Sequence, residues 1–179
     1  VVTQKSGVAY LLDPARRGRE IWEYRWGRGS PVGGVWGAAV DGTNAYFAVA
    51  DQLTPEPGGL HAVSLATGQR LWFTPPPAPV CTAGPGCSPA QSAALTAIPG
   101  VVFSGSADGA VRAYASADGR VLWTFDTNRD FPTVNGVKAD GGAIDGPGPV
   151  VAGGMVYVTA GNGGFVGTPG NVLLAFGLE

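Results

Sequence analysis

A glycine followed four residues later by a tryptophan recurs about every 50 residues, and this repeat constrains the fold more than any other feature. The pattern occupies residues 18–22, 68–72 and 119–123. A short apolar run precedes each copy, and a fourth such run, at 171–176, has no tryptophan after it. Repeats of this length are typical of propeller blades, in which each unit buries its sheet only against its neighbours.

Pairs of short apolar segments complete the repeats. They flank tight turns rich in Gly, Pro, Asn and Asp, at 41–44, 99–100 and 152–154. Together with the segments on either side of the Gly-x-x-x-Trp glycine, they give four short strands in a meander. The sequence therefore predicts an all-β chain that forms a partial β-propeller of four-stranded antiparallel blades.

The composition fits a chain that turns often around an apolar core. The 30 Gly and 15 Pro among 179 residues approach the share found in disordered segments. A hydrophobic content of 45% and five tryptophans supply the core that disordered chains lack. No apolar run approaches the roughly 20 residues of a membrane span, and a net charge of −2 argues against nucleic acid as a partner.

We expect a single propeller segment, 1–179, of about three and a half blades. Residues 1–26 form a partial blade without its innermost strand, 35–74 and 91–127 form whole blades, and 143–179 form a second partial blade. Because propellers close with at least four blades, we expect a piece of a larger ring, with closure through the two ends as the alternative. The start shows no leader pattern, which indicates a mature or cloned segment, and open blade edges predict self-association.

The two cysteines, Cys81 and Cys87, lie in one loop rich in Pro, Gly and Ala. The chain's single histidine, His61, lies on another element, so too few ligands are at hand for zinc. We expect a disulfide that closes this loop in an oxidising compartment. A pair of free thiols is the alternative.

The lengths of the connections indicate which end of the propeller carries function. The turns within the hairpins are short and open on one side of the ring. Longer connections, many of them between blades, open on the other side, at 22–35, 75–92, 126–146 and 161–170. Long loops on one end of a rigid scaffold are where sites are built.

The residues 67–72 and 118–123 resemble the pyrroloquinoline-quinone (PQQ) repeat of quinoprotein dehydrogenases. Further stretches look like the C-terminal part of the polyvinyl-alcohol dehydrogenases; they are 86–94, 105–109, 142–150 and 169–176. The resemblance implies an eight-bladed, periplasmic or secreted propeller. It also implies oxidation of secondary alcohols or polyvinyl alcohol with PQQ, together with calcium, and a cytochrome c as electron acceptor.

The chain contains no Cys-x-x-Cys-His haem site, and by this resemblance it covers only the last part of the ring. We therefore expect the isolated segment to be inactive. The alternative function is a non-catalytic propeller scaffold that binds protein or polysaccharide.

A flat, anionic quinone needs an aromatic plane to stack on and polar donors for its oxygens. Trp36 stands where an inner strand begins and is the candidate for stacking, with packing between blades as the alternative. Gln91 and Ser92 open the next inner strand and are candidate donors to cofactor oxygens, unless they satisfy backbone groups.

The third long loop supplies the remaining candidates. Asn135 and Lys138 are predicted to contact the cofactor, with a solvated loop as the alternative for Lys138. Asp145 stands at the mouth of the last inner strand and is the candidate catalytic base, or a calcium or cofactor contact; an Asx-type turn is the alternative. His61 is expected to pack within the blades or lie at the surface. Trp22, Trp72 and Trp123 are expected to pack between blades.

Overall fold

The computed structural model describes residues 1–29, 36–82, 86–162 and 167–178. Within these residues the only helical element is a single 3-10 turn, η1 (Pro14–Arg16), and no helix could span a membrane. The predicted start of the second blade, residue 35, and part of the loop 161–170 lie outside the described residues.

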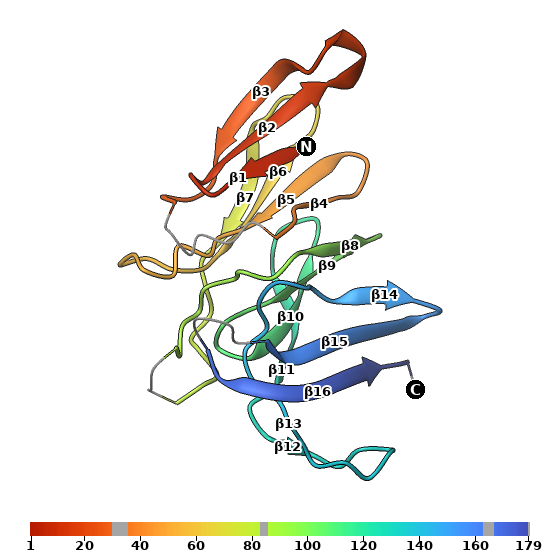
Figure 1. The fold of residues 1–179 in the computed structure, drawn as a ribbon. Coiled ribbons are helices and arrows are strands. Elements are labelled where there is room, and N and C mark those ends of the chain that lie inside the picture. The colour runs from red at the N-terminus through yellow and green to blue at the C-terminus, as the bar shows by residue number, and fades with distance from the viewer. Residues whose placement is uncertain (30–35, 83–85, 163–166, 179) are drawn as a thin grey trace.

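Five antiparallel sheets follow one another along the chain (Figure 1). The first contains β1 (Val2–Gln4), β2 (Val8–Asp13) and β3 (Arg19–Arg25). Two four-stranded sheets follow. One contains β4 (Ala39–Val40), β5 (Asn44–Ala48), β6 (Leu60–Ser64) and β7 (Arg70–Thr74). The other contains β8 (Thr96–Ile98), β9 (Val101–Gly105), β10 (Ala110–Ala115) and β11 (Val121–Asp126). The last contains β14 (Val150–Ala152), β15 (Met155–Asn162) and β16 (Pro169–Phe176).

This arrangement confirms the predicted fold class. The chain is a partial propeller with two four-stranded blades between two three-stranded sheets. The remaining sheet, a two-stranded hairpin of β12 (Asp130–Phe131) and β13 (Ala139–Asp140), was not expected from the sequence. It interrupts the third long loop and projects at the lower end of the molecule in Figure 1.

The repeated tryptophans join each blade to the next one. The indole Nε1–H of Trp22, on β3, donates to the carbonyl of Leu65 in the second blade at 2.9 Å. The indole of Trp72, on β7, makes the same bond to Ser116 in the third blade at 3.0 Å. Trp123, on β11, packs edge-on against Phe176 of β16, with ring centroids 5.1 Å apart. The three tryptophans therefore pack between blades, as predicted.

The glycines of the second and third repeats each pack against the tryptophan of the preceding repeat. Gly68 and Gly119 have φ of +71° and +74°, in the region that favours glycine. A Cβ on Gly68 would lie 2.7 Å from Cγ of Trp22, and one on Gly119 would lie 2.5 Å from Cε3 of Trp72. Within one repeat, the glycine packs against the preceding blade and the tryptophan packs against the following blade. Both residues recur because each forms a different interface between blades.

Three clusters of buried side chains fill the spaces between successive blades. The first joins residues such as Ala9 and Phe47, and the second joins Tyr46 to Tyr114. The third places Ile144, from the third long loop, beside Val111 of β10. Each blade therefore buries its faces against its neighbours, as a propeller requires.

The predicted disulfide between Cys81 and Cys87 is present. The loop it closes is bonded to the third blade, because the backbone N–H of Val80 donates to Asp108 Oδ2 at 3.1 Å. Asp108 also forms a buried ion pair with Arg112, at 2.6 Å. Burial alone would raise the pKa of Asp108, but the Arg112 guanidinium holds it below its usual value.

Candidate functional site

Two loops that are far apart in the sequence meet at the inner end of the third blade. The backbone N–H of Ala94 donates to the carbonyl of Gly146 at 3.0 Å, and the N–H of Leu95 donates to the carbonyl of Gly37 at 3.0 Å. Gly37 precedes the innermost strand of the second blade, and Gly146 precedes that of the last. Consecutive backbone groups of one blade thus hold the inner loops of both neighbours.

These two bonds bring together two of the residues singled out in the sequence. The indole Nε1–H of Trp36 donates to Oδ1 of Asp145 at 3.2 Å, across 109 residues of sequence. The Trp36 side chain is 65% exposed, and Asp145 is half-buried. An indole that packed only between blades would be covered, as Trp22 is. The exposed ring of Trp36 therefore offers a face to a flat ligand.

The backbone around Asp145 is fixed on both sides. The N–H of Ile144 donates to the carbonyl of Ser106 at 3.0 Å, while the carbonyl of Gly146 accepts from Ala94. Gly148 approaches the carbonyl oxygen of Ala94 so closely that a Cβ there would lie 1.8 Å from it. The carboxylate is therefore carried on a segment that is preorganised against the third blade, as a catalytic or binding group requires.

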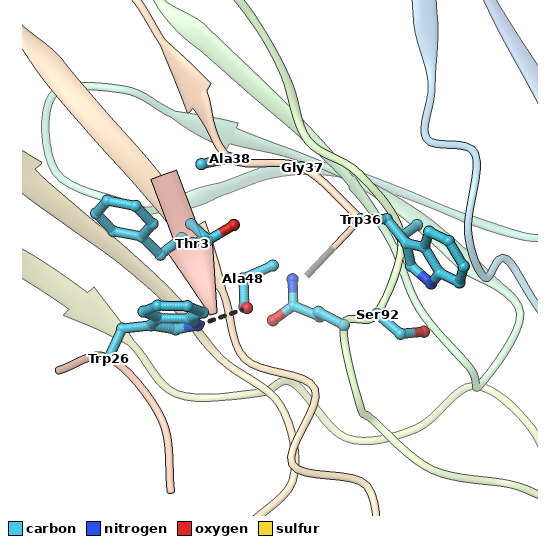
Figure 2. Close-up of a pocket in the computed structure, with 10 residues that line it drawn as sticks. Thr3, Trp26, Trp36, Gly37, Ala38, Ala48 and Ser92 are labelled. Atoms are coloured by element: carbon cyan, nitrogen blue, oxygen red, sulfur yellow. Dashed lines mark hydrogen bonds between the residues drawn. The ribbon is translucent and has the colours of Figure 1, made fainter. Parts of the chain in front are cut away.

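A narrow cleft, the Trp36 cleft, is lined in part by Trp36 (Figure 2). Trp36, Ser92 and Trp26 are among the residues that line it. Ser92 is 4% exposed, and its hydroxyl has no hydrogen-bond partner among the described residues. A buried hydroxyl without a partner costs about 1–3 kcal/mol, so a ligand atom that accepted this bond would recover that free energy.

The amide of Gln91 is engaged within the protein. Its Oε1 accepts from the N–H of Gly59 at 2.8 Å, and its Nε2 donates to Ser104 Oγ at 2.9 Å and to the Tyr114 hydroxyl at 3.1 Å. The side chain is 2% exposed. These contacts join the second and third blades and position the segment that carries Ser92.

Asn135 and Lys138 lie elsewhere, on the connection between β12 and β13. Asn135 Oδ1 accepts from the N–H of Val137 at 3.2 Å, which forms a local turn. Lys138 Nζ lies 3.8 Å from carboxylate oxygens of both Asp130 and Asp140, and its side chain is 77% exposed. The hollow beside this hairpin shares no lining residue with the Trp36 cleft. The structure therefore does not bring these two residues to Trp36 and Asp145.

His61 packs between the first two blades. Its Nδ1 lies 2.7 Å from the Tyr24 hydroxyl, and its ring lies 4.4 Å from that of Phe73, centroid to centroid. Burial, reinforced by the positive charge of Arg70, lowers the pKa of His61 to about 4. The imidazole is therefore neutral at pH 7, which fits the expected packing role.

The described residues contain no group of three or more His, Cys, Asp or Glu side chains that could hold a metal ion. Asp145 would therefore need carbonyl oxygens or groups from other blades as further ligands to calcium. Sequence reasoning missed Trp26, which is buried and donates to the carbonyl of Ala48 at 3.0 Å. An aromatic residue at the start of a long interblade loop is the signal that could have identified it.

Comparison with known proteins identifies the family. The protein family described as outer membrane protein assembly factor BamB (PQQ_2) matches residues 5–140. The chain belongs to this family of PQQ-repeat propellers. It is 44% identical to a polyvinylalcohol dehydrogenase of Pseudomonas sp. over 192 residues and 40% identical to one of Sphingopyxis sp. (strain 113P3) over 196 residues.

The whole chain aligns with each of these relatives but spans only 30% of their length. Among solved structures, BamB from Moraxella catarrhalis superposes with a TM-score of 0.59 at 21% identity, over 96% of this chain and 44% of that one. A europium-containing methanol dehydrogenase superposes with a TM-score of 0.50 at 16% identity, over 86% of this chain and 36% of that one. These structures share the fold.

Proposed function

We propose that this chain is a propeller segment of a PQQ-dependent dehydrogenase that oxidises secondary alcohols or polyvinyl alcohol. The observation that carries the proposal is the pairing of the exposed Trp36 indole with Asp145 at the inner end of the blades. The identities of 44% and 40% to two polyvinylalcohol dehydrogenases support it. The residues present fit part of a quinone site, since an aromatic face, a carboxylate and a hydroxyl without a partner lie on neighbouring inner loops.

Each of these side chains has a distinct part in the proposed site. The quinone, when bound, takes up the two electrons released by the alcohol. Trp36 provides the plane on which the cofactor stacks, and its N–H orients the Asp145 carboxylate. Asp145 accepts the alcohol proton at Oδ2, the oxygen that the indole does not engage. The buried Ser92 hydroxyl would donate to an oxygen of the cofactor if the cleft, whose volume is about 10 Å³, opened to admit it.

The remaining parts of this proposal extend beyond the chain itself. Since the polyvinylalcohol dehydrogenases are about three times as long, other blades of an eight-bladed ring would complete the pocket and its cationic groups. Asn135 and Lys138 would reach the cofactor only if the β12–β13 hairpin turned toward it. We place the complete protein in the periplasm or outside the cell, with calcium beside the quinone and a cytochrome c as acceptor, and we expect the isolated segment to be inactive.

The test uses this segment within a complete ring, supplied with PQQ and calcium. We expect uptake of the cofactor, seen by its absorbance, and dye-linked oxidation of a secondary alcohol. Asp145→Asn should lower kcat by at least about a hundredfold, the scale of losing a general base. Asp118→Asn, at an exposed turn between the strands β10 and β11, is the matched control and should leave kcat unchanged. Unchanged turnover in Asp145→Asn would overturn the assignment of the base.

A non-catalytic scaffold that binds protein or polysaccharide is the second candidate. The observation in its favour is the match to a family described as an outer membrane assembly factor. Failure of the complete ring to take up PQQ at saturating cofactor and calcium would favour this candidate over the dehydrogenase.

A further inference from the structure

A second, larger cavity lies between the first two blades, and we call it the proline pocket. Its volume is about 630 Å³, within the range of about 300–1,000 Å³ that is usual for ligand sites. Five prolines line much of it: Pro55, Pro57, Pro75, Pro76 and Pro89. The aromatic rings of Trp26 and Phe73 and the imidazole of His61 also line it.

The proline pocket is next to the Trp36 cleft. Trp26 lines both of them, so its indole belongs to both walls. Gln91 links the two walls. It lines the Trp36 cleft, and its backbone N–H donates at 2.8 Å to the carbonyl of Val49, which lines the proline pocket. The loops that follow β3, β5 and β7 build the pocket, and Figure 1 shows the loops after β5 and β7 at one side of the blades, away from the hairpin turns.

The walls are preorganised by contacts between these loops. Asp51 accepts hydrogen bonds from the backbone N–H groups of Arg28 and Gly29, at 2.6 and 3.0 Å, which fixes the first loop to the second. Gly58 lies so close to the third loop that a Cβ there would be 2.3 Å from the carbonyl oxygen of Pro89. A pocket built in this way loses little conformational entropy when a ligand binds.

The charges at the pocket are compensated within the protein. Arg28 forms an ion pair with Glu56, and both oxygens of Asp51 accept backbone N–H groups. His61 is neutral at pH 7, because burial lowers its pKa to about 4. The pocket therefore complements a neutral ligand, and a charged one would have to displace an existing pair.

One polar group of the wall suits a hydroxyl ligand. The Tyr24 hydroxyl lies 2.7 Å from Nδ1 of His61. If that hydroxyl donates, the imidazole proton resides on Nε2, which makes Nε2 the donor of a residue that lines the pocket. The wall thus combines a broad apolar surface with a neutral hydrogen-bonding group, the combination that an aliphatic chain with regularly spaced hydroxyls requires.

We propose that the proline pocket binds a stretch of the polymeric alcohol chain next to the reacting unit. The identity of the polymer rests on the proposed function above, whereas the neutral, apolar character of the ligand rests on the pocket itself. The remote chain would be held between Trp26 and Phe73, and the unit to be oxidised would lie at the exposed face of Trp36 beside Asp145. Binding of this kind raises the preference for a polymer over a short alcohol.

The test needs neither cofactor nor turnover. Short-chain polyvinyl alcohol is titrated into the 179-residue chain, with 5-fluorotryptophan in place of tryptophan, and followed by fluorine NMR and calorimetry. We expect the Trp26 resonance to shift and that of Trp123, which packs between the third and last blades, to stay. Phe73→Ala should weaken binding about tenfold, whereas Leu71→Ala, an exposed apolar residue on the same strand, should not. Dextran and a proline-rich peptide are titrated in parallel.

The proposal is overturned if polyvinyl alcohol leaves the Trp26 resonance in place, or if Phe73→Ala and Leu71→Ala bind it equally well. Dextran or the peptide shifting Trp26 more strongly than polyvinyl alcohol would also overturn it. If Phe73→Ala fails to fold, the shift of Trp26 in the unmodified chain decides the matter. Polymer binding without PQQ uptake by the complete ring would refute the dehydrogenase but not the pocket, and PQQ uptake without polymer binding would refute only the pocket.

Discussion

Replacing a repeat glycine by alanine measures how much the contact between blades contributes to stability. In Gly119→Ala the alanine must adopt φ near +74°, and its Cβ would lie 2.3 Å from Thr74 Oγ1 and 2.5 Å from Cε3 of Trp72. The left-handed backbone costs an L-residue about 1–2 kcal/mol, and forcing a methyl group into a packed contact costs about 1–3 kcal/mol more. We therefore expect a loss of about 2–5 kcal/mol in the free energy of unfolding.

The first repeat provides the matched control. Gly18 has the same φ of +74°, but a Cβ on it would meet nothing within 4 Å among the described residues. Gly18→Ala should therefore lose only the backbone part, about 1–2 kcal/mol. The assay is urea unfolding followed by tryptophan fluorescence, with the free energy taken from midpoint and slope.

A double-mutant cycle isolates the contact itself. In a Trp72→Leu background the excess cost of Gly119→Ala should fall but not vanish, because the ring that the methyl group meets is gone while Thr74 Oγ1, 2.3 Å from the new Cβ, remains. Equal losses in Gly18→Ala and Gly119→Ala, or an unchanged excess in the Trp72→Leu background, would refute the explanation of the repeat.

Two further predictions concern pH and association. The folded state lowers the pKa of His61 from 6.5 to about 4, so as pH falls from 6.5 toward 4 the unfolded chain takes up a proton that the folded chain excludes. The free energy of unfolding should therefore decline over this window by up to about 3 kcal/mol. His61→Gln should flatten this decline, measured as urea midpoints. A pH profile identical in both proteins would contradict this. The open edges of the three-stranded end sheets, at β1 and β16, should pair between copies. The sedimentation coefficient should then rise with concentration, and a constant monomeric value at high concentration would contradict this prediction.

The fold could be predicted because the repeat is a local signal that recurs. The spacing of Trp22, Trp72 and Trp123, together with the turn residues, was sufficient to identify strands, blades and the packing of the indoles. The β12–β13 hairpin could not be predicted in the same way, because its strands are two residues each and are held by tertiary contacts. One such contact is the bond from the N–H of Asp140 to Asn171 Oδ1, at 2.9 Å.

The candidate site was predictable only in part. Trp36 and Asp145 were both singled out because each precedes an inner strand, and the propeller geometry brings such positions together. Their hydrogen bond depends on the Ala94–Leu95 backbone, whose role no side-chain pattern reveals. Position in a long loop was not enough for Lys138, since the loop folds into a hairpin with its own carboxylate partners.

The most direct test of the central claim is the affinity of the complete ring for PQQ when Trp36 is changed. If the indole is the stacking surface, Trp36→Ala should weaken binding at least about tenfold, the value of one lost aromatic stack. Trp36→Phe, which keeps an aromatic face, should recover much of that loss. Equal affinity in the unmodified protein and in Trp36→Ala would contradict the account, because the exposed ring beside Asp145 would then have no part in holding the quinone.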